Sequence, residues 1–150
     1  MSSFVEHSGF RRLSSLGLPT EDFVVAGSGP LFARHWMTDP SDVDVVARGI
    51  AWEMAAQLGD ADDAPYSTVK RILLFDGSIE VLNGWFPEIW SVDRLIEDAD
   101  VFLGFRFLTL PTTIATKRML GRPRDMLHLE ILRRHGWDIG AQLSSDTELS

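Results

Sequence analysis

A short segment, SDVDVVA, alternates acid and valine, and it constrains the fold more than any other part of the chain. Successive side chains of a β-strand point to opposite faces of the sheet. A strand over residues 43–47 therefore directs Val43 and Val45 into a core and places Asp42 and Asp44 together on the other face. We expect a sheet in which one strand carries two neighbouring carboxylates.

The overall composition is that of a globular protein with one core. The chain has 150 residues, of which 45% are hydrophobic, and this length suits a single domain. It has no cysteine, which excludes disulfides, thiolate metal sites and cysteine nucleophiles. The first residues, MSSFVEHSGFRR, lack the pattern of a signal peptide, and no apolar run is long enough for a membrane span. We therefore expect a cytoplasmic protein with no membrane partner.

Hydrophobic periodicity and turn residues predict helices and strands in mixed order, an α+β (mixed α/β) fold with a small mixed sheet flanked by helices. The predicted strands are 22–26, 43–47, 67–75, 78–82 and 101–108, and the predicted helices are 4–16, 30–36, 49–58, 91–97, 111–120 and 123–135. Asp76-Gly77 indicates a hairpin, because both positions of its turn need positive φ. Residues 60–65 are predicted as an acidic loop and 142–150 as a frayed tail. Core candidates in the first helix are Phe4, Phe10 and Leu13.

The two aspartates point to a metal ion. Two carboxylates on one strand face repel each other, and their partial burial is costly unless a cation joins them. Mg²⁺ takes hard oxygen ligands and often uses one or two carboxylates, leaving positions for water and phosphate. Alternatively, Asp42 and Asp44 lie on the solvent side of an edge strand and bind nothing.

Two other segments strengthen the metal interpretation. Glu80 alternates with Ile79 and Val81 in the segment SIEVL, so it completes a three-carboxylate cluster if its strand lies beside that of Asp44. Such a cluster can hold metal ions around a transferring phosphoryl group, and one carboxylate can accept a proton. Upstream, the turn Gly27-Ser28-Gly29 opens a predicted helix, whose N-terminal N–H groups attract phosphate.

Charge along the chain is uneven. The net charge is −8, which argues against a general electrostatic nucleic-acid binder. Six of the 14 Lys and Arg residues nevertheless fall between Lys117 and Arg134, where only Asp125 and Glu130 oppose them. This segment is either a binding patch for a small polyanion such as a nucleoside triphosphate or a solvated helix face.

These residues together resemble the nucleotidyltransferase superfamily. Ala26-Gly27-Ser28 followed by Asp42-Val43-Asp44-Val45 is similar to the signature of the minimal nucleotidyltransferases, and Ile79-Glu80-Val81 is similar to the third acidic strand of that family. The resemblance covers about residues 22–132 and implies one nucleotidyltransferase-like domain, with its core at about 22–135 and its active-site acids on adjacent strands.

A second block resembles the later helices of AbiEii-type nucleotidyltransferases. It consists of LPTTIATK, ending at Lys117, and GRPRDMLHL, which contains Arg124 and Asp125. By this likeness Lys117 and Arg124 would bind the nucleotide, and Asp125 would be a further functional acid. The chain departs from the family pattern at Arg124, where lysine is usual, and at His128, where a second aspartate is usual.

The resemblance implies transfer of a nucleoside monophosphate from a nucleoside triphosphate to an acceptor hydroxyl, with release of pyrophosphate. It implies Mg²⁺ or Mn²⁺ on Asp42 and Asp44, with Glu80 as third ligand or base, and phosphates at Gly27 and Ser28. The acceptor stays open between a tRNA end, a protein and a small molecule. The alternative is a non-catalytic binding module with a protein partner, for example in a toxin–antitoxin pair.

Overall fold

The protein is described by a computed structural model that covers residues 7–38, 40 and 42–140. The chain divides into two compact units, Met1–Thr109 and Leu110–Ser150. The predicted mixed α/β class is confirmed, because the first unit is a mixed sheet with helices and the second is a pair of helices.

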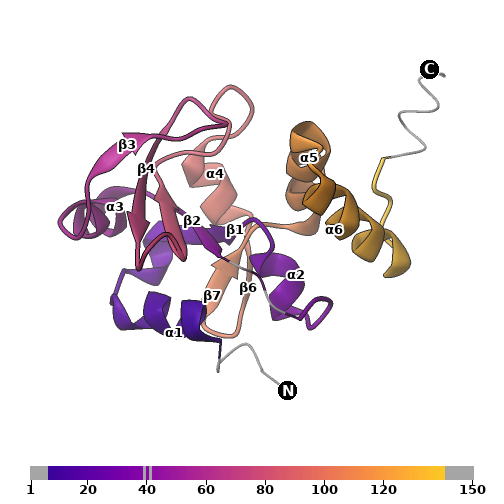
Figure 1. The fold of residues 1–150 in the computed structure, drawn as a ribbon, viewed down its shortest axis with the longest axis horizontal. Helices are drawn as coiled ribbons and strands as arrows, with labels where there is room; N and C mark the ends of the chain where they lie inside the picture. The colour runs from indigo at the N-terminus through magenta and orange to yellow at the C-terminus, as the bar shows by residue number, and fades with distance from the viewer. Residues whose placement is uncertain (1–6, 39, 41, 141–150) are drawn as a thin grey trace. The chain divides into compact units, whose positions relative to one another are not determined.

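The first unit is built on a sheet of seven strands in the order β3-β4-β5-β2-β1-β7-β6 (Figure 1). Within the sheet, β2 pairs in parallel with β5 and β1 with β7, and the other neighbours are antiparallel. The strands are β1 (Phe23–Ala26), β2 (Val43–Ala47), β3 (Ala61–Asp63), β4 (Lys70–Leu74), β5 (Ile79–Leu82), β6 (Asp100–Phe102) and β7 (Phe105–Phe107).

One face of the sheet carries the main core. Val43 and Val45 of β2 and Ile79 and Val81 of β5 are buried there, as the alternation predicts. Three helices cover this face, and α1 brings the buried core residue Phe10. They are α1 (Ser8–Ser15), α2 (Gly29–Ala33) and α3 (Gly49–Ala56), and a 3-10 turn, η2 (Thr20–Asp22), precedes β1.

The opposite face is also partly covered. Val24, Val46 and Leu82 alternate with the core residues on their strands, and all three are buried. Helix α4 (Val92–Glu97) contacts β1, and α1 and α4 lie on opposite sides of the sheet (Figure 1). Because Asp44 and Glu80 alternate with core residues, they share the face of Val46 and Leu82.

The hairpin prediction is confirmed, with a longer turn than expected. β4 and β5 pair antiparallel around residues 75–78. Phe75, Asp76 and Gly77 all have positive φ. The turn therefore includes one residue on each side of the predicted Asp76-Gly77 pair.

Two predictions about strands are wrong. The apolar run 101–108 is not one strand but a hairpin of β6 and β7, which turns at Leu103 and Gly104 with φ of 55° and 83°. The predicted acidic loop 60–65 contains β3, an exposed edge strand that pairs with β4. Charged side chains are common on edge strands, because they discourage pairing with other chains.

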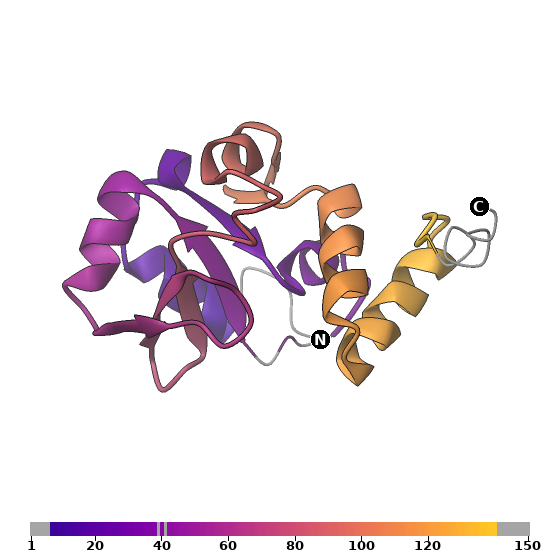
Figure 2. The same cartoon turned by 90° about the horizontal axis from the view of Figure 1, so that it is seen from above.

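The second unit contains α5 (Leu110–Leu120) and α6 (Pro123–Arg134), which pack against each other (Figure 2). Both helices agree with the prediction to within one residue at each end. Gly121 separates them in a left-handed conformation, with φ of 58°. Such a conformation at a helix C-terminus favours glycine, which has no Cβ to clash.

Some predictions concern parts of the chain outside the described residues. These are the start of the first helix with Phe4, and the tail 142–150. Phe10 and Leu13, the other two core candidates of the first helix, are buried as predicted. Among the described residues, no helix has the length and apolar character needed to cross a membrane.

Candidate functional site

The carboxylates of the first unit meet at the junction of β2 and β5. In the parallel register between these strands, Asp44 is the partner of Glu80. Neighbouring strands lie about 4.8 Å apart, so the two side chains are adjacent on one face. Asp42 lies two residues before Asp44, just outside β2, and is half-buried. A backbone hydrogen bond of 2.8 Å from Val43 to Ser78 aligns the beginnings of the two strands.

Gly27 brings the glycine turn against the first acidic strand. Ala26 is the register partner of Asp44, and Gly27 follows with φ of 64°. A Cβ added to Gly27 would overlap the Asp44 carboxylate. The turn and the acid-valine segment are therefore in direct contact, and only glycine leaves room for the carboxylate at this position.

A guanidinium extends the acids into a row that crosses four strands. Arg71 of β4 donates to Glu80 Oε2 at 3.2 Å and to Asp62 Oδ1 at 3.3 Å. We call Asp42, Asp44, Glu80, Arg71 and Asp62 the charged row. The hydrogen bond to Glu80 is the main cause of a raised pKa for Arg71, and the hydrogen bond to Asp62 adds to it. Together they outweigh the opposite effect of burial. The guanidinium therefore stays charged.

Glu80 has a second contact on the same face. The Tyr66 hydroxyl lies 3.4 Å from Glu80 Oε1, which is long for a hydrogen bond between oxygens. Tyr66 belongs to an aromatic cluster with Trp85 and Phe86. Trp85, which follows the Glu80 strand, is 2% exposed. The Trp85 ring is therefore packed in the interior, against Tyr66 and Phe86.

The donor set suits a hard divalent cation. Asp42 and Asp44 offer carboxylate oxygens, and Mg²⁺ commonly binds one or two carboxylates together with water and phosphate. The Asp44 carboxylate packs directly against Gly27, which brings the glycine turn next to this donor. Within residues 7–38, 40 and 42–140, no group of three or more His, Asp or Glu side chains is placed to hold a metal ion. The carboxylates that suit a divalent cation are therefore the pair Asp42 and Asp44.

The helix whose N-terminus was predicted to attract phosphate is short. α2 has 5 residues, and the N–H groups of Leu31 and Phe32 both bond to the Ser28 carbonyl. The Ser28 side chain makes no capping hydrogen bond to the helix. So short a helix adds little dipole of its own. The Ser28 hydroxyl is the side-chain group of this turn that a phosphate could use.

The second unit holds a buried cluster of charges. Lys117 of α5 is 4% exposed, and its Nζ lies 2.9 Å from His128 Nδ1 and 3.7 Å from Asp125 Oδ1. Asp125, which is fully buried, accepts hydrogen bonds from the backbone and guanidinium of Arg122 at 2.7 to 3.2 Å. We call Lys117, Arg122, Asp125 and His128 the buried cluster.

The protonation states of the buried cluster follow from these contacts. Burial, followed by the charge of Lys117, lowers the pKa of His128 from 6.5 to about 4. His128 is thus neutral near neutral pH, and its Nδ1 can accept a hydrogen bond from the Lys117 ammonium. Burial alone would raise the pKa of Asp125, but the Arg122 hydrogen bonds and the Lys117 charge outweigh it and lower that pKa.

The structure thus groups the predicted site residues in two sets. Gly27, Ser28, Asp42, Asp44 and Glu80 belong to the first unit, where Gly27 and Glu80 both lie next to Asp44 and Asp42 lies just before β2. Lys117, Arg124 and Asp125 belong to the second unit, where Lys117 and Asp125 contact each other and Arg124 is exposed on the first turn of α6.

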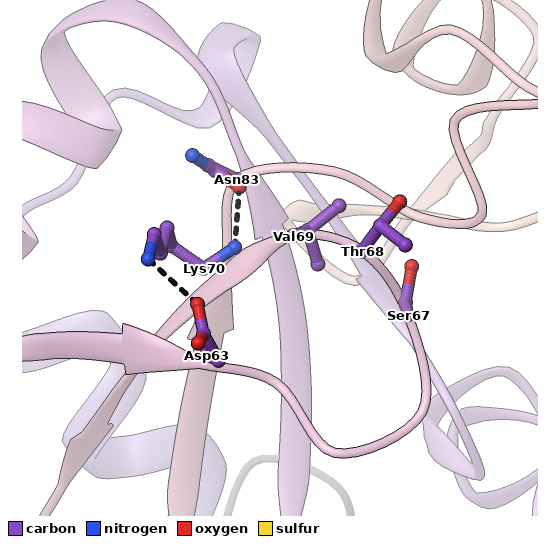
Figure 3. Close-up of a pocket in the computed structure, with 6 residues that line it drawn as sticks. All are labelled: Asp63, Ser67, Thr68, Val69, Lys70 and Asn83. Carbon is purple, nitrogen blue, oxygen red and sulfur yellow. Dashed lines mark hydrogen bonds and ion pairs between the residues drawn. The ribbon is translucent and has the colours of Figure 1, made fainter.

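An open pocket lies beside the hairpin of the first unit (Figure 3). Its volume is about 310 Å³, and Lys70 at its wall bonds to Asp63 at 2.6 Å. The Asn83 side chain accepts a hydrogen bond of 3.0 Å from the Lys70 backbone. The lining residues are Asp63, Ser67, Thr68, Val69, Lys70 and Asn83. The polar groups on Asp63, Lys70 and Asn83 thus bond to one another across the wall of the pocket.

The sequence interpretation missed Arg71, Tyr66 and the role of His128. Arg71 could have been found, because counting back along the hairpin from its turn puts Arg71 and Glu80 on one face. Tyr66 lies in a loop, where no periodicity fixes the direction of a side chain. His128 stands one helical turn after Arg124, a spacing that alone does not predict contact with Lys117.

Comparison with protein-family models, with curated proteins and with solved structures found no match for this chain. The arrangement of the residues themselves therefore carries the functional argument.

Proposed function

We propose that the protein is a metal-dependent nucleotidyltransferase with a nucleotidyltransferase-like fold in its first unit. The observation that carries the proposal is the contact of the Gly27 turn with Asp44, on a strand whose register places Glu80 beside the same carboxylate. The turn, the acid pair and the third acid come from separate segments. Their meeting at one strand junction is what a phosphoryl-transfer site requires.

Each residue has a role in this proposal. Asp42 and Asp44 hold Mg²⁺ or Mn²⁺, and the ion, when bound, supplies positive charge to the phosphates. Gly27 lets the turn lie directly against the Asp44 carboxylate, so that phosphates held at the turn are next to the ion, and the Ser28 hydroxyl donates to a phosphate oxygen. Glu80 serves either as a third ligand or as the base for the acceptor hydroxyl.

The reaction transfers a nucleoside monophosphate. A bond forms between the acceptor oxygen and the α-phosphorus, and the bond from that phosphorus to the oxygen bridging to the β-phosphate breaks. The proton of the acceptor hydroxyl passes to a carboxylate, and pyrophosphate leaves with the electron pair of the broken bond. In-line positioning and charge neutralisation are the main needs of such a transfer.

The residues of the second unit enter the proposal only through the family resemblance. By that likeness Lys117 and Arg124 bind nucleotide phosphates and Asp125 is a further functional acid. The acceptor is a tRNA end, a protein or a small molecule, and the cytoplasm is the proposed location.

One observation favours the alternative of a non-catalytic binding module, as in a toxin–antitoxin partner. Arg71 already neutralises the Glu80 carboxylate, so this acid is stable without a metal. A binding module of this kind would bind a protein partner but would transfer no nucleotide.

The decisive experiment incubates the protein with each α-labelled nucleoside triphosphate, Mg²⁺ or Mn²⁺, and cell extract. We expect label to enter one class of molecule, and the Asp42→Asn/Asp44→Asn variant to lose the transfer by about 10³-fold or more, as loss of a catalytic metal does. The control is Asp60→Asn, which changes an exposed acid outside the charged row. No transfer and no metal-dependent nucleotide binding by the wild type would refute the proposal.

A further inference from the structure

We propose that Arg71 is a positioning residue that holds Glu80 away from the metal, so that the charged row binds one divalent cation, through Asp42 and Asp44. This inference rests on the proposed function. It decides between the two roles left open for Glu80, because a carboxylate held by Arg71 is a neighbour of the ion and not its ligand.

The sheet itself fixes Arg71 beside Glu80. Leu73 is the register partner of Glu80, and Arg71 lies two residues earlier on the same strand and therefore on the same face. On its other side, Arg71 is the register partner of Asp62 on β3. The guanidinium bonds to both acids, at 3.2 and 3.3 Å, and so bridges the strands on either side of β4.

Burial makes the contact with Glu80 the stronger of the two. The side chain of Glu80 is 10% exposed, whereas that of Asp62 is 68% exposed. Water screens the Asp62 charge, but the Glu80 carboxylate needs a cation close by. A guanidinium suits this need, because it is always charged and donates from a planar fork.

The pairing of Arg71 with Glu80 favours one metal ion over two. Arg71 neutralises Glu80, whose carboxylate contacts Arg71 and Tyr66. Asp42 and Asp44 can bind one divalent ion, because Mg²⁺ commonly uses one or two carboxylates. A second ion bound through Glu80 would have to displace the guanidinium and would meet its positive charge.

The test is a titration of the full chain with Mn²⁺, in which electron paramagnetic resonance measures the concentration of free ion. This measurement does not require enzymatic turnover. We expect one Mn²⁺ per wild-type chain. Arg71→Met keeps the length of the side chain but frees Glu80, so we expect a second Mn²⁺ or an affinity about tenfold tighter. Arg71→Lys retains the charge and should bind as the wild type does. The matched control, Lys70→Met, removes a neighbouring cation that bonds to exposed Asp63 and should also change nothing.

The results distinguish a failure of the inference about Arg71 from a failure of the proposed metal site. Two Mn²⁺ ions on the wild type, or equal binding by wild type and Arg71→Met, would overturn the inference and leave the metal site standing. No Mn²⁺ binding by the wild type would remove the metal site and the inference together.

A second variant covers the case in which circular dichroism shows Arg71→Met unfolded. Glu80→Gln removes the carboxylate and keeps the shape of the side chain. We expect its single Mn²⁺ site to keep an affinity within about threefold of the wild type, whereas loss of a ligand would weaken it by tenfold or more. That larger loss would show that Glu80 is a ligand and overturn the inference.

Discussion

The charged row of the first unit and the buried cluster of the second use the same kinds of side chain in opposite ways. In the row, the acids outnumber the single guanidinium, and Asp44 and Glu80 are adjacent on one face of the sheet. In the buried cluster, Lys117 and Arg122 surround the carboxylate of Asp125, and His128 is neutral near neutral pH.

The difference is between neighbouring acids that favour an added cation and a buried carboxylate that already has cations of its own. Neighbouring carboxylates repel each other, and an added cation stabilises them, whereas Asp125 is already paired with Lys117 and Arg122. The row is therefore the better candidate for a metal site, and the cluster is a candidate for holding α5 and α6 together. Four measurements test this contrast, in order of decreasing expected effect.

Arg71→Met should produce the largest loss of stability. It leaves the nearly buried Glu80 carboxylate beside Asp44 without its cation, which should lower the free energy of unfolding by about 3 kcal/mol in metal-free buffer. Mn²⁺ should restore part of this loss, because an ion that binds the folded state stabilises it. Urea unfolding with and without Mn²⁺ measures both effects.

Two controls belong to that measurement. Adding Glu80→Gln to Arg71→Met should recover most of the stability, because no uncompensated charge then remains. Lys70→Met should change stability little, because its ion pair with Asp63 is exposed. A loss in Arg71→Met that Glu80→Gln does not repair would show that the guanidinium acts through something other than Glu80.

Lys117→Met should cost about 2 kcal/mol, and Mn²⁺ should not restore it. The ammonium is buried with Asp125, but this carboxylate keeps its hydrogen bonds from Arg122, which limits the loss. Urea unfolding followed by tryptophan fluorescence measures the change, and Arg118→Met, an exposed change on the same helix, is the control. Recovery of Lys117→Met by Mn²⁺ would contradict the proposed separation of the two sites.

Gly27→Ala should cost about 1 kcal/mol more than Gly17→Ala. Both glycines have positive φ, at 64° and 68°, so both variants carry similar backbone strain. Only at Gly27 does the added methyl group meet a carboxylate, that of Asp44, since nothing lies within 4 Å at Gly17. Thermal unfolding gives the stability difference, and a Mn²⁺ titration should show weaker binding in Gly27→Ala alone. Equal behaviour of the two variants would separate the turn from the site.

His128→Gln should change the pH dependence of stability by no more than about 1 kcal/mol, since His128 is only partly buried. The folded pKa is about 4, below the unfolded value of 6.5, so the unfolded state takes up the proton first. Wild-type stability should therefore fall as pH decreases from 6.5 to 4, in addition to the effects of other groups. Urea unfolding across this range should show a shallower decrease for His128→Gln, and parallel curves would exclude His128 as the cause.

Much of the first unit could be predicted from the sequence, because alternation is a strong local signal. It placed Val43 and Val45 in the core and Asp44 on the opposite face, and the Asp76-Gly77 turn located the hairpin that carries Glu80. Which strand pairs with the hairpin depends on tertiary contacts and has no local sequence signal. The sequence could state only that Glu80 would join the aspartates if β5 lay beside β2, which it does.

The remaining features depend on contacts without a local signal. Leu103 adopts positive φ, which is uncommon for leucine, so the turn between β6 and β7 could not be expected within an apolar run. β3 is exposed at all three residues and therefore lacks alternation. Lys117 is buried because Asp125 and His128 of another helix neutralise and bond it, and helix periodicity predicts neither partner.

The parallel register of β2 and β5 has a consequence for how the protein is made. Asp44 leaves the ribosome well before Glu80, and the strands that align them cannot pair until residue 82 has emerged. A growing chain therefore presents its two aspartates without the acid and guanidinium that complete the row. The charged row belongs to the finished sheet, so a chain arrested before β5 would carry the Asp42–Asp44 motif without Glu80 beside it.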